Sequence, residues 1–273
     1  FDVTSKGFHA MVLAEGRSIF IDPYARQETA HYIVYYKKDF SSDKAFHCAF
    51  EEAQEEEEES ELTLDNTELI PNKKDKAKDS NRMMATYCSE AVTLRTYRAA
   101  VACTGEFGEF HGGTVTEALE AIVVTMNRVN SVYNRDLAIH LELIANNDEI
   151  VFPNALTDPF VGNDQALVLL NESQVQIDAR IGTANYDIGH TVSTGAGGVA
   201  FLGVICTNQK AGGITGTNNP VGDPFDIDYV SHEMGHQFGG NHTFNGSQGS
   251  CGGNGGSATA LEPGSGSTIQ AYA

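Results

Sequence analysis

An eleven-residue stretch beginning at His232 reads His-Glu-Met-Gly-His-Gln-Phe-Gly-Gly-Asn-His. Residues four apart share one face of a helix, so His232 and His236 can offer imidazole nitrogens to one metal ion while Glu233 projects beside it. Gly239 can adopt the left-handed conformation that ends a helix, which brings His242 round as a third ligand. The spacing therefore predicts a helix that carries a zinc site.

Three protein ligands leave the fourth position of a tetrahedral zinc ion for water, as in a catalytic site rather than a closed structural one. Glu233 then stands where a general base can take a proton from that water. The alternatives are a coincidental histidine-rich helix end and a site that has lost its activity. Because five positions are fixed within eleven residues, coincidence explains the stretch poorly. We interpret it as a hydrolase active site.

The residues before the motif predict where the same helix begins. Asp223 has a side chain suited to an N-cap, and Pro224 is suited to the first helical position. Asp226 falls in the first turn, where a carboxylate complements the helix dipole. We predict a helix over 224–239.

The full signature resembles that of the metzincin zinc peptidases, and the Met-Gly-His sequence within it is most similar to the reprolysin (adamalysin) branch, including its bacterial secreted members. The resemblance covers roughly residues 90–273. It implies an α+β fold with α/β-like order, in which a twisted mixed sheet accompanies two long helices and a zinc-binding helix. It also implies one catalytic Zn²⁺ and endopeptidase activity.

The apolar pattern from residue 92 onward alternates between the periods of strands and helices. The predicted elements are a strand at 94–102, a helix at 114–132, a strand at 137–144, a helix at 174–181, and strands at 186–192 and 198–205. This order, followed by the zinc helix, is similar to the N-terminal subdomain of a metzincin.

In the resembling family a methionine in a tight turn forms an apolar base beneath the ligand histidines. Gln270 stands at this Met-turn position here, and its polar amide needs hydrogen-bond partners under the site. Tyr272 matches a tyrosine that in some branches approaches the metal and can donate to developing negative charge. The alternative role for Tyr272, which we favour, is a wall residue of the substrate pocket.

The resemblance also implies that the strand before the zinc helix lies along the substrate cleft. Gly198, Val199, Ala200 and Phe201 fit that strand, because an unpaired edge can accept an extended peptide as an added strand. A core strand that tolerates glycine is the alternative.

The first third of the chain has a different pattern from the rest. Residues 1–50 are β-rich and, by their position ahead of a peptidase domain, resemble the tail of a propeptide. Residues 51–84 start with a glutamate block and continue into a lysine-rich run, which predicts a flexible linker. We expect the catalytic domain over 85–273, incomplete at its C-terminal end. The β-rich runs of the first segment are 8–13, 18–22 and 31–36.

Cys48 suggests how the N-terminal segment could inhibit the enzyme. A thiolate at the fourth zinc position would exclude water and hold the enzyme latent, as in some metzincin proregions. The residues around Cys48 lack a recognisable switch motif, so a buried or disulfide-bonded cysteine is the alternative. Cys48 is therefore a candidate latency thiol, and the chain a candidate zymogen.

The other cysteines and histidines carry weaker signals. Five cysteines are too few and too scattered for a small disulfide scaffold. Cys103 and Cys206 are the predicted disulfide, because secretion favours disulfides and both residues end neighbouring predicted strands. The histidines outside the motif have no metal-ligand spacing, so we expect structural roles for them. We place His190 on a strand where polar residues can face solvent.

Composition excludes several classes of partner. The formal net charge of −20 argues against a nucleic-acid groove, which needs an excess of Lys and Arg. No apolar run approaches the length needed to span a membrane. The acidic residues of 51–61 lack the spaced Asp, Asn and Gly of a calcium loop, so a structural Ca²⁺ has no support. The resemblance to the metzincins implies a secreted or extracellular protein with protein or peptide substrates, which we expect to be a monomer.

The predicted function is zinc-dependent endopeptidase cleavage of extracellular proteins. The leading alternative is a catalytically impaired zinc-binding or adhesion module, because Gln270 replaces the expected methionine and the sequence stops at Ala273. A zinc amidase that acts on nonprotein substrates is a second alternative.

Overall fold

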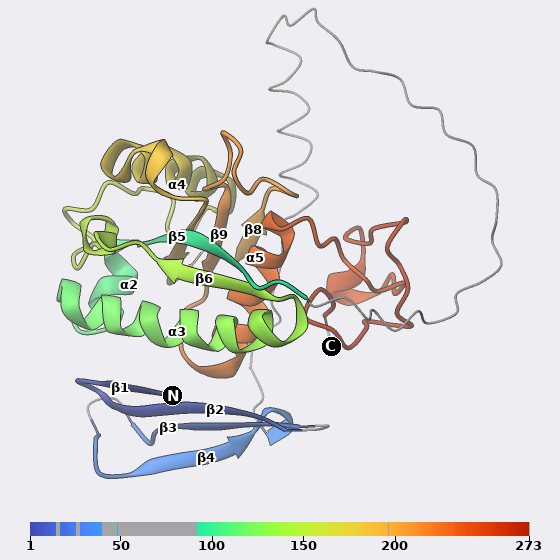
Figure 1. Ribbon diagram of the computed structural model, residues 1–273, viewed down its shortest axis with the longest axis horizontal. Coiled ribbons are helices and arrows are strands. Elements are labelled where there is room, and N and C mark those ends of the chain that lie inside the picture. Colours follow the sequence, from blue (N-terminus) through green and yellow to red (C-terminus); the bar gives the residue numbers. More distant parts are fainter. Residues whose placement is uncertain (15–16, 26–27, 40–47, 49–91, 196, 273) are drawn as a thin grey trace, which may run out of the picture.

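The computed structural model describes residues 1–14, 17–25, 28–39, 48, 92–195 and 197–272. The predicted linker at 51–84 lies outside the described residues. Figure 1 shows a small N-terminal sheet stacked beneath the long helix α3, with a larger sheet above that helix and α4 on the far side. Within the described ranges, no helix combines the length and apolarity needed to cross a membrane.

The N-terminal sheet is antiparallel, with its four strands paired in chain order. The three longer strands agree with the three β-rich runs of the sequence, and the first strand is additional to the prediction. A short 3-10 helix, η1 (Lys37–Asp39), follows the sheet. The strands are β1 (Asp2–Thr4), β2 (Gly7–Ala14), β3 (Arg17–Pro23) and β4 (Tyr32–Tyr36).

The larger sheet is mixed and has the strand order β6-β5-β7-β9-β8. Neighbours along β6, β5, β7 and β9 are parallel, whereas β8 runs antiparallel to β9 and forms one edge. The strand β9 was not predicted, because four residues that include two glycines give no alternation. The strands are β5 (Arg95–Cys103), β6 (Ile139–Leu143), β7 (Ile188–Ser193), β8 (Gly198–Ala200) and β9 (Gly213–Gly216).

Two long helices cover the two faces of this sheet, as expected. The first, α3, begins after the N-cap Thr114, whose hydroxyl oxygen accepts the Glu117 N–H. The second, α4, begins eight residues before its predicted start, at Ala166. The helices are α2 (Gly105–Phe110), α3 (Val115–Asp136), α4 (Ala166–Ile181) and α5 (Ser231–Gln237), with short 3-10 helices η2 (Asn147–Ile150), η3 (Thr183–Asn185) and η5 (Gly249–Cys251).

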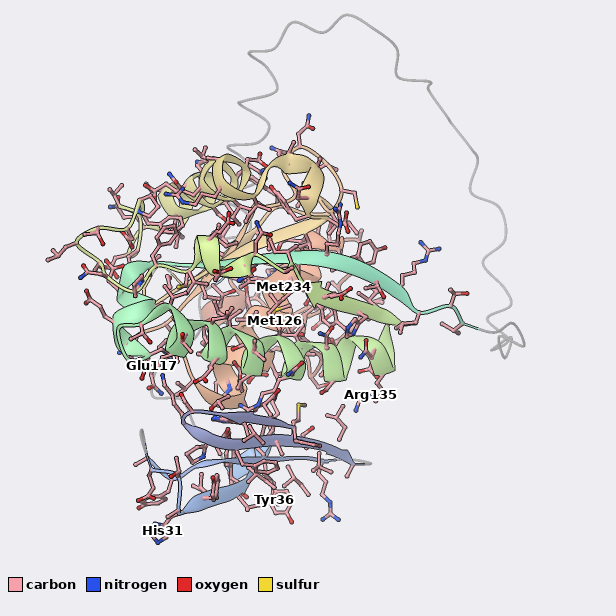
Figure 2. All side chains as sticks on the ribbon, turned by 60° about the vertical axis from the view of Figure 1, so that its left-hand side comes forward. His31, Tyr36, Glu117, Met126, Arg135 and Met234 are labelled. Carbon is pink, nitrogen blue, oxygen red and sulfur yellow. The ribbon has the colours of Figure 1, made fainter. Side chains whose placement is uncertain are left out.

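The hydrophobic core has one cluster on each face of the larger sheet. On the α3 side, Met126 of that helix and Met234 of α5 belong to one buried cluster that also contains residues of β5, β6 and β7. Figure 2 shows the two methionines near each other. On the α4 side, Leu169, Leu170 and Ile177 pack against the sheet. The motif helix is therefore part of the core, which fixes its position relative to the strands.

The helix of the motif differs from the predicted 224–239. Its first half, Pro224–Val230, is a π-helix labelled η4, and it continues directly into α5, which ends at Gln237. Asp223 directly precedes η4 as predicted, but its backbone is already helical and its side chain makes no capping hydrogen bond. The wider π-helical turns are frequent at functional sites.

The predicted disulfide between Cys103 and Cys206 is wrong, since both are free thiols. Cys103 lies opposite Val192 in the sheet, whereas the Cys206 N–H bonds to the Asp187 carbonyl at the other end of β7. Five residues of strand separate these points by roughly 16 Å. A disulfide requires Cα atoms within about 7 Å of each other.

Arg128 of α3 joins the N-terminal sheet to the motif helix. Its side chain is 3% exposed and bonds Asp226 of η4 at 2.8 Å and Asp22 of β3 at 2.5 Å. Asp22 also accepts hydrogen bonds from His9 and from the Tyr35 hydroxyl, each at 2.8 Å. The Arg128 charge is therefore shared between two carboxylates from different parts of the chain.

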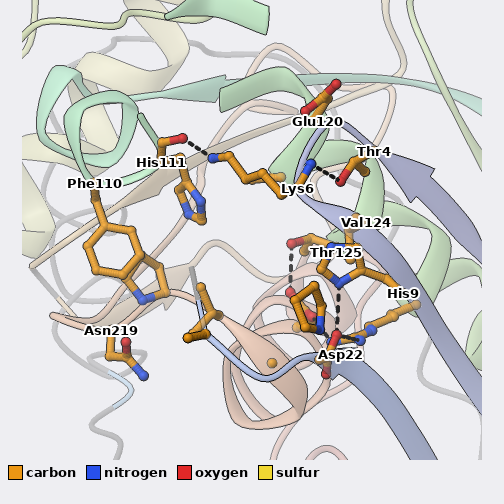
Figure 3. A pocket seen from close by; sticks show the side chains of 18 of the residues that line it. Thr4, Lys6, His9, Asp22, Phe110, His111, Glu120, Val124, Thr125 and Asn219 are labelled. Carbon is orange, nitrogen blue, oxygen red and sulfur yellow. Dashed lines mark hydrogen bonds and ion pairs between the residues drawn. The ribbon is translucent and has the colours of Figure 1, made fainter. Parts of the chain in front are cut away.

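A cleft of about 690 Å³ separates the N-terminal sheet from α3 beside this ion pair. Figure 3 shows Asp22, His9 and Thr125 close together beside the cleft, with Lys6 reaching the backbone carbonyl of His111. Lys37 forms a second ion pair across the junction with Asp228 of η4. Polar contacts thus carry much of the docking of this sheet.

Asp22→Asn is expected to weaken the docking of the N-terminal sheet by about 1–2 kcal/mol, because a neutral amide cannot balance Arg128. Burial alone would raise the pKa of Asp22, but the hydrogen bond from His9 and the Arg128 charge hold it below its usual value of 3.8. A lowered carboxyl pKa stabilises the fold above the unfolded value and loses that effect as the pH falls further.

Thermal unfolding at several pH values tests this prediction. The deficit of the variant should be full near pH 7 and should shrink once the pH falls below about 4. Asp39→Asn, which neutralises an exposed carboxylate in the same N-terminal region, should unfold like the parent. A deficit of the same size at pH 3 would contradict the proposed ion pair.

Candidate metal centre

The three motif histidines meet in a buried cluster. His232 and His236 lie on one face of α5 and His242 follows the helix, and all three side chains are fully buried. Their Nε2 atoms are 3.0 Å apart for His232 and His236, and 3.2 Å apart for each pair that includes His242. Gly239, with φ +93, makes the turn that brings His242 back.

A backbone carbonyl orients each of the three rings. The Nδ1 atoms of His232, His236 and His242 lie 2.6, 2.6 and 2.5 Å from the carbonyl oxygens of residues 269, 240 and 254. A carbonyl only accepts, so each Nδ1 carries the proton and each Nε2 keeps a lone pair. Three lone pairs that face one another at this distance repel unless a cation lies between them, so the donor set fits a metal ion.

Cys48 completes a set of four possible ligands. Its side chain is fully buried, and its Sγ lies 3.6 Å from the His236 Nε2. The ligand atoms of Cys48 and the three histidines all lie within 4.8 Å of one another. A tetrahedral zinc ion separates two nitrogen ligands by about 3.3 Å and a nitrogen from a sulfur by about 3.6 Å. The geometry fits a tetrahedral site in which sulfur takes the fourth position.

Burial keeps the imidazoles neutral, as metal ligation requires. It lowers the pKa of His232 to about 3 and that of His242 to about 4, and it lowers the pKa of His236 well below its usual value. The proximity of the rings adds to the effect, because a proton on one disfavours a proton on the next.

Glu233 lies beside the cluster on the same helix and is fully buried. Burial raises the pKa of its carboxyl well above the usual value, and the neighbouring Cys48 thiol opposes that rise. A raised pKa makes the carboxylate a better proton acceptor near neutral pH. Glu233 therefore lies beside the Cys48 thiol, on the same helix as His232 and His236.

Gln270 lies beneath the motif helix and has the hydrogen-bond partner that its amide needs. Its Nε2 donates to the Gly240 carbonyl at 3.0 Å, and this carbonyl also orients His236. A Cβ at Gly235 would lie 2.4 Å from the Gln270 Oε1, so the helix and the amide fit closely because residue 235 is glycine. The amide of Gln270 thus packs against the motif helix beside His236.

Tyr272 points its hydroxyl into the cluster. The oxygen lies 3.2 Å from the His242 Nε2, and the ring stacks on His232 with the centroids 5.7 Å apart. Burial and the nearby Cys48 and Glu233 groups raise the pKa of the phenol, which therefore stays protonated. Tyr272 can serve both as a wall of the site and as a hydrogen-bond donor.

Strand β8 lies at the edge of the larger sheet nearest to the cluster. Gly198, Val199 and Ala200 form β8, whereas Phe201 lies after the strand and bonds back to the Gly212 carbonyl. Cys48 makes a parallel β-bridge with Gly198. The residue whose sulfur joins the cluster thus pairs with the edge on which an extended peptide was expected.

Sequence reasoning missed the groups that hold the histidines. The three orienting groups are backbone carbonyls, which have no residue-type signature. The sequence-based prediction for His190 was also wrong, because this side chain is fully buried rather than facing solvent. A histidine within the otherwise apolar and small β7 segment was the one available signal.

A comparison with protein-family models agrees with this geometry. Residues 93–273 match the family model described as Metallo-peptidase family M12B Reprolysin-like. No curated protein matches the chain. Among solved structures, one titled "Structure of a chaperone-substrate complex" has 15% sequence identity and a TM-score of 0.37, and the match covers 60% of this chain and 29% of that chain.

Proposed function

The chain belongs to the reprolysin-like metallopeptidases of family M12B, and on that premise we propose that it is a zinc-dependent endopeptidase, secreted as a latent form, that cleaves extracellular proteins. The observation that carries the proposal is the set of three Nε2 atoms 3.0–3.2 Å apart, each with its Nδ1 on a backbone carbonyl. Metal-ligating histidines typically donate their other ring N–H to a backbone carbonyl in this way.

His232, His236 and His242 would hold the ion, which when bound supplies a Lewis acid and lowers the pKa of a coordinated water. Glu233 accepts a proton from the attacking water at its carboxylate and later returns it to the departing amine. Tyr272 donates its hydroxyl hydrogen bond toward negative charge that develops beside His242. Strand β8 binds the substrate backbone as an added strand.

The N-terminal segment would keep this site inactive. Cys48 occupies the place of the attacking water, next to Glu233, and pairs with Gly198 on the strand proposed for the substrate. One residue thus blocks both the reacting position and the peptide-binding edge. Activation requires that Cys48 leaves the cluster.

Peptide hydrolysis by a chain freed of the Cys48 thiol tests the proposed function. The Cys48→Ala chain, loaded with one equivalent of Zn²⁺, should cleave casein and a quenched peptide, lose activity to a chelator and regain it when zinc is added. Hydrolysis that survives complete metal removal would refute a metallopeptidase. Tight binding of one zinc without hydrolysis would favour the zinc-binding module instead.

A further inference from the structure

Gln237 follows the second ligand histidine directly and has its amide buried under the motif helix. Its Nε2 donates to the carbonyls of Gly189 at 2.7 Å and Lys210 at 3.2 Å. A Cβ at Gly213 would lie 2.4 Å from the amide carbon, so the strand packs tightly against this side chain. With both N–H groups used, the Oε1 is available only as an acceptor.

His190 of β7 supplies the donor for that oxygen. Its Nδ1 lies 2.9 Å from the Gln237 Oε1, and its Nε2 lies 2.9 Å from the Thr215 hydroxyl. Because the amide oxygen cannot donate, the Nδ1 carries the proton and the Nε2 accepts from Thr215. Burial lowers the pKa of His190 to about 4, so the ring is neutral and keeps this one tautomer at neutral pH.

These bonds connect the metal-binding helix to the edge strand. Thr215 lies on β9, and its register partner across the antiparallel pair is Gly198 of β8. The path therefore runs from His236 through Gln237, His190 and Thr215 to the strand proposed for the substrate. Every side chain on it is fully buried, so no water competes for its hydrogen bonds.

We propose that His190 is a positioning residue for peptide hydrolysis, because it holds Gln237 and thereby fixes the second ligand histidine relative to the strand β7. The inference rests on the proposed function, but its metal-binding consequence does not require turnover. The two hydrogen bonds of His190 go to Gln237 and Thr215, so on the metal side it acts through Gln237. The eleven-residue motif does not include it.

Two amide substitutions separate this role from a general contribution to stability. In His190→Asn the amide nitrogen replaces the imidazole Nδ1, so the bond to Gln237 can form while the bond to Thr215 is lost. In His190→Gln the amide reaches the place of the Nε2, so the bond to Thr215 can form while the bond to Gln237 is lost. Each variant removes one of the two hydrogen bonds.

The measurement is the rate at which zinc passes to a coloured chelator, made with the full chain in the Cys48→Ala background. His190→Gln should release zinc about tenfold faster than the parent, which is the usual size of such a supporting effect. His190→Asn should remain within about twofold of the parent. In the peptide assay the loss for His190→Gln should appear in kcat rather than in KM, because the edge strand itself is intact.

Matched variants exclude simpler explanations. Thr215→Val removes only the second hydrogen bond and should behave like His190→Asn. His140→Gln, on β6 at the opposite edge of the sheet, should not change zinc release. Equal zinc release by His190→Asn and His190→Gln would overturn the proposal, whatever their melting temperatures. If the parent hydrolyses no peptide, the proposed function fails, while the comparison of zinc release still decides the role of His190.

Discussion

In the Cys48→Ala chain, Glu233→Gln is expected to lower kcat/KM for peptide hydrolysis by about 10²–10⁴-fold, the usual contribution of a positioned general base. Glutamine keeps the volume of the side chain, so the buried space beside the cluster stays filled. It cannot accept a proton from water. Bound zinc should stay at one equivalent, because Glu233 is not among the clustered ligand atoms.

The pH dependence of kcat/KM is a second test of the Glu233 carboxylate. A general base works only when it is deprotonated, so kcat/KM should rise with pH through the pKa of Glu233. Burial raises this pKa above its usual value of 4.5, and the acidic limb should lie correspondingly higher. Glu233→Asp should keep such a limb at lower activity, because it retains a carboxylate.

Glu142→Gln is the matched control for this substitution, since it changes an exposed carboxylate of β6 to an amide far from the cluster. It should hydrolyse peptide at the rate of the parent. If Glu233→Gln did so too while binding zinc, another group would have to be the base. If it bound no zinc, the carboxylate would instead be needed to assemble the site.

The metal cluster could be predicted from sequence because its geometry is local. The spacing of His232 and His236 places them on one helical face. The turn at Gly239 then brings His242 back towards the other two histidines. The strand β8 could be located for a similar reason, although Phe201 proved to lie beyond it. These inferences needed no knowledge of distant contacts.

The support of the cluster could not be predicted, because it depends on tertiary structure. Arg128 and Asp226 are 98 residues apart in the chain, and each alone resembles an ordinary charge on a helix. Gln237 appeared only as a variable position of the motif, although it is bonded to β7. The π-helical turns of η4 also lack a periodicity that distinguishes them from α-helix over seven residues.

Removing the Cys48 thiol should raise the peptidase activity of the zinc-loaded full chain by at least about a hundredfold. A tethered ligand acts at an effective concentration on the order of 1 mM, so a thiolate with a dissociation constant of about 10 μM would leave roughly one molecule in a hundred open. Cys48→Ala vacates the fourth position, whereas Cys206→Ala removes an exposed thiol and should leave the chain latent.

Cobalt substitution shows whether the sulfur binds the ion or only blocks access to it. A Co²⁺-loaded parent chain should have a thiolate charge-transfer band in the near ultraviolet, and Cys48→Ala should lack it while still binding one cobalt ion through the three histidines. Activation without loss of such a band would mean that Cys48 excludes substrate at Gly198 without ligating the metal. No activation at all would contradict latency through this residue. In the parent chain the Cys48 sulfur lies 3.6 Å from the His236 Nε2, and the alanine variant no longer has this sulfur to separate the cluster from water.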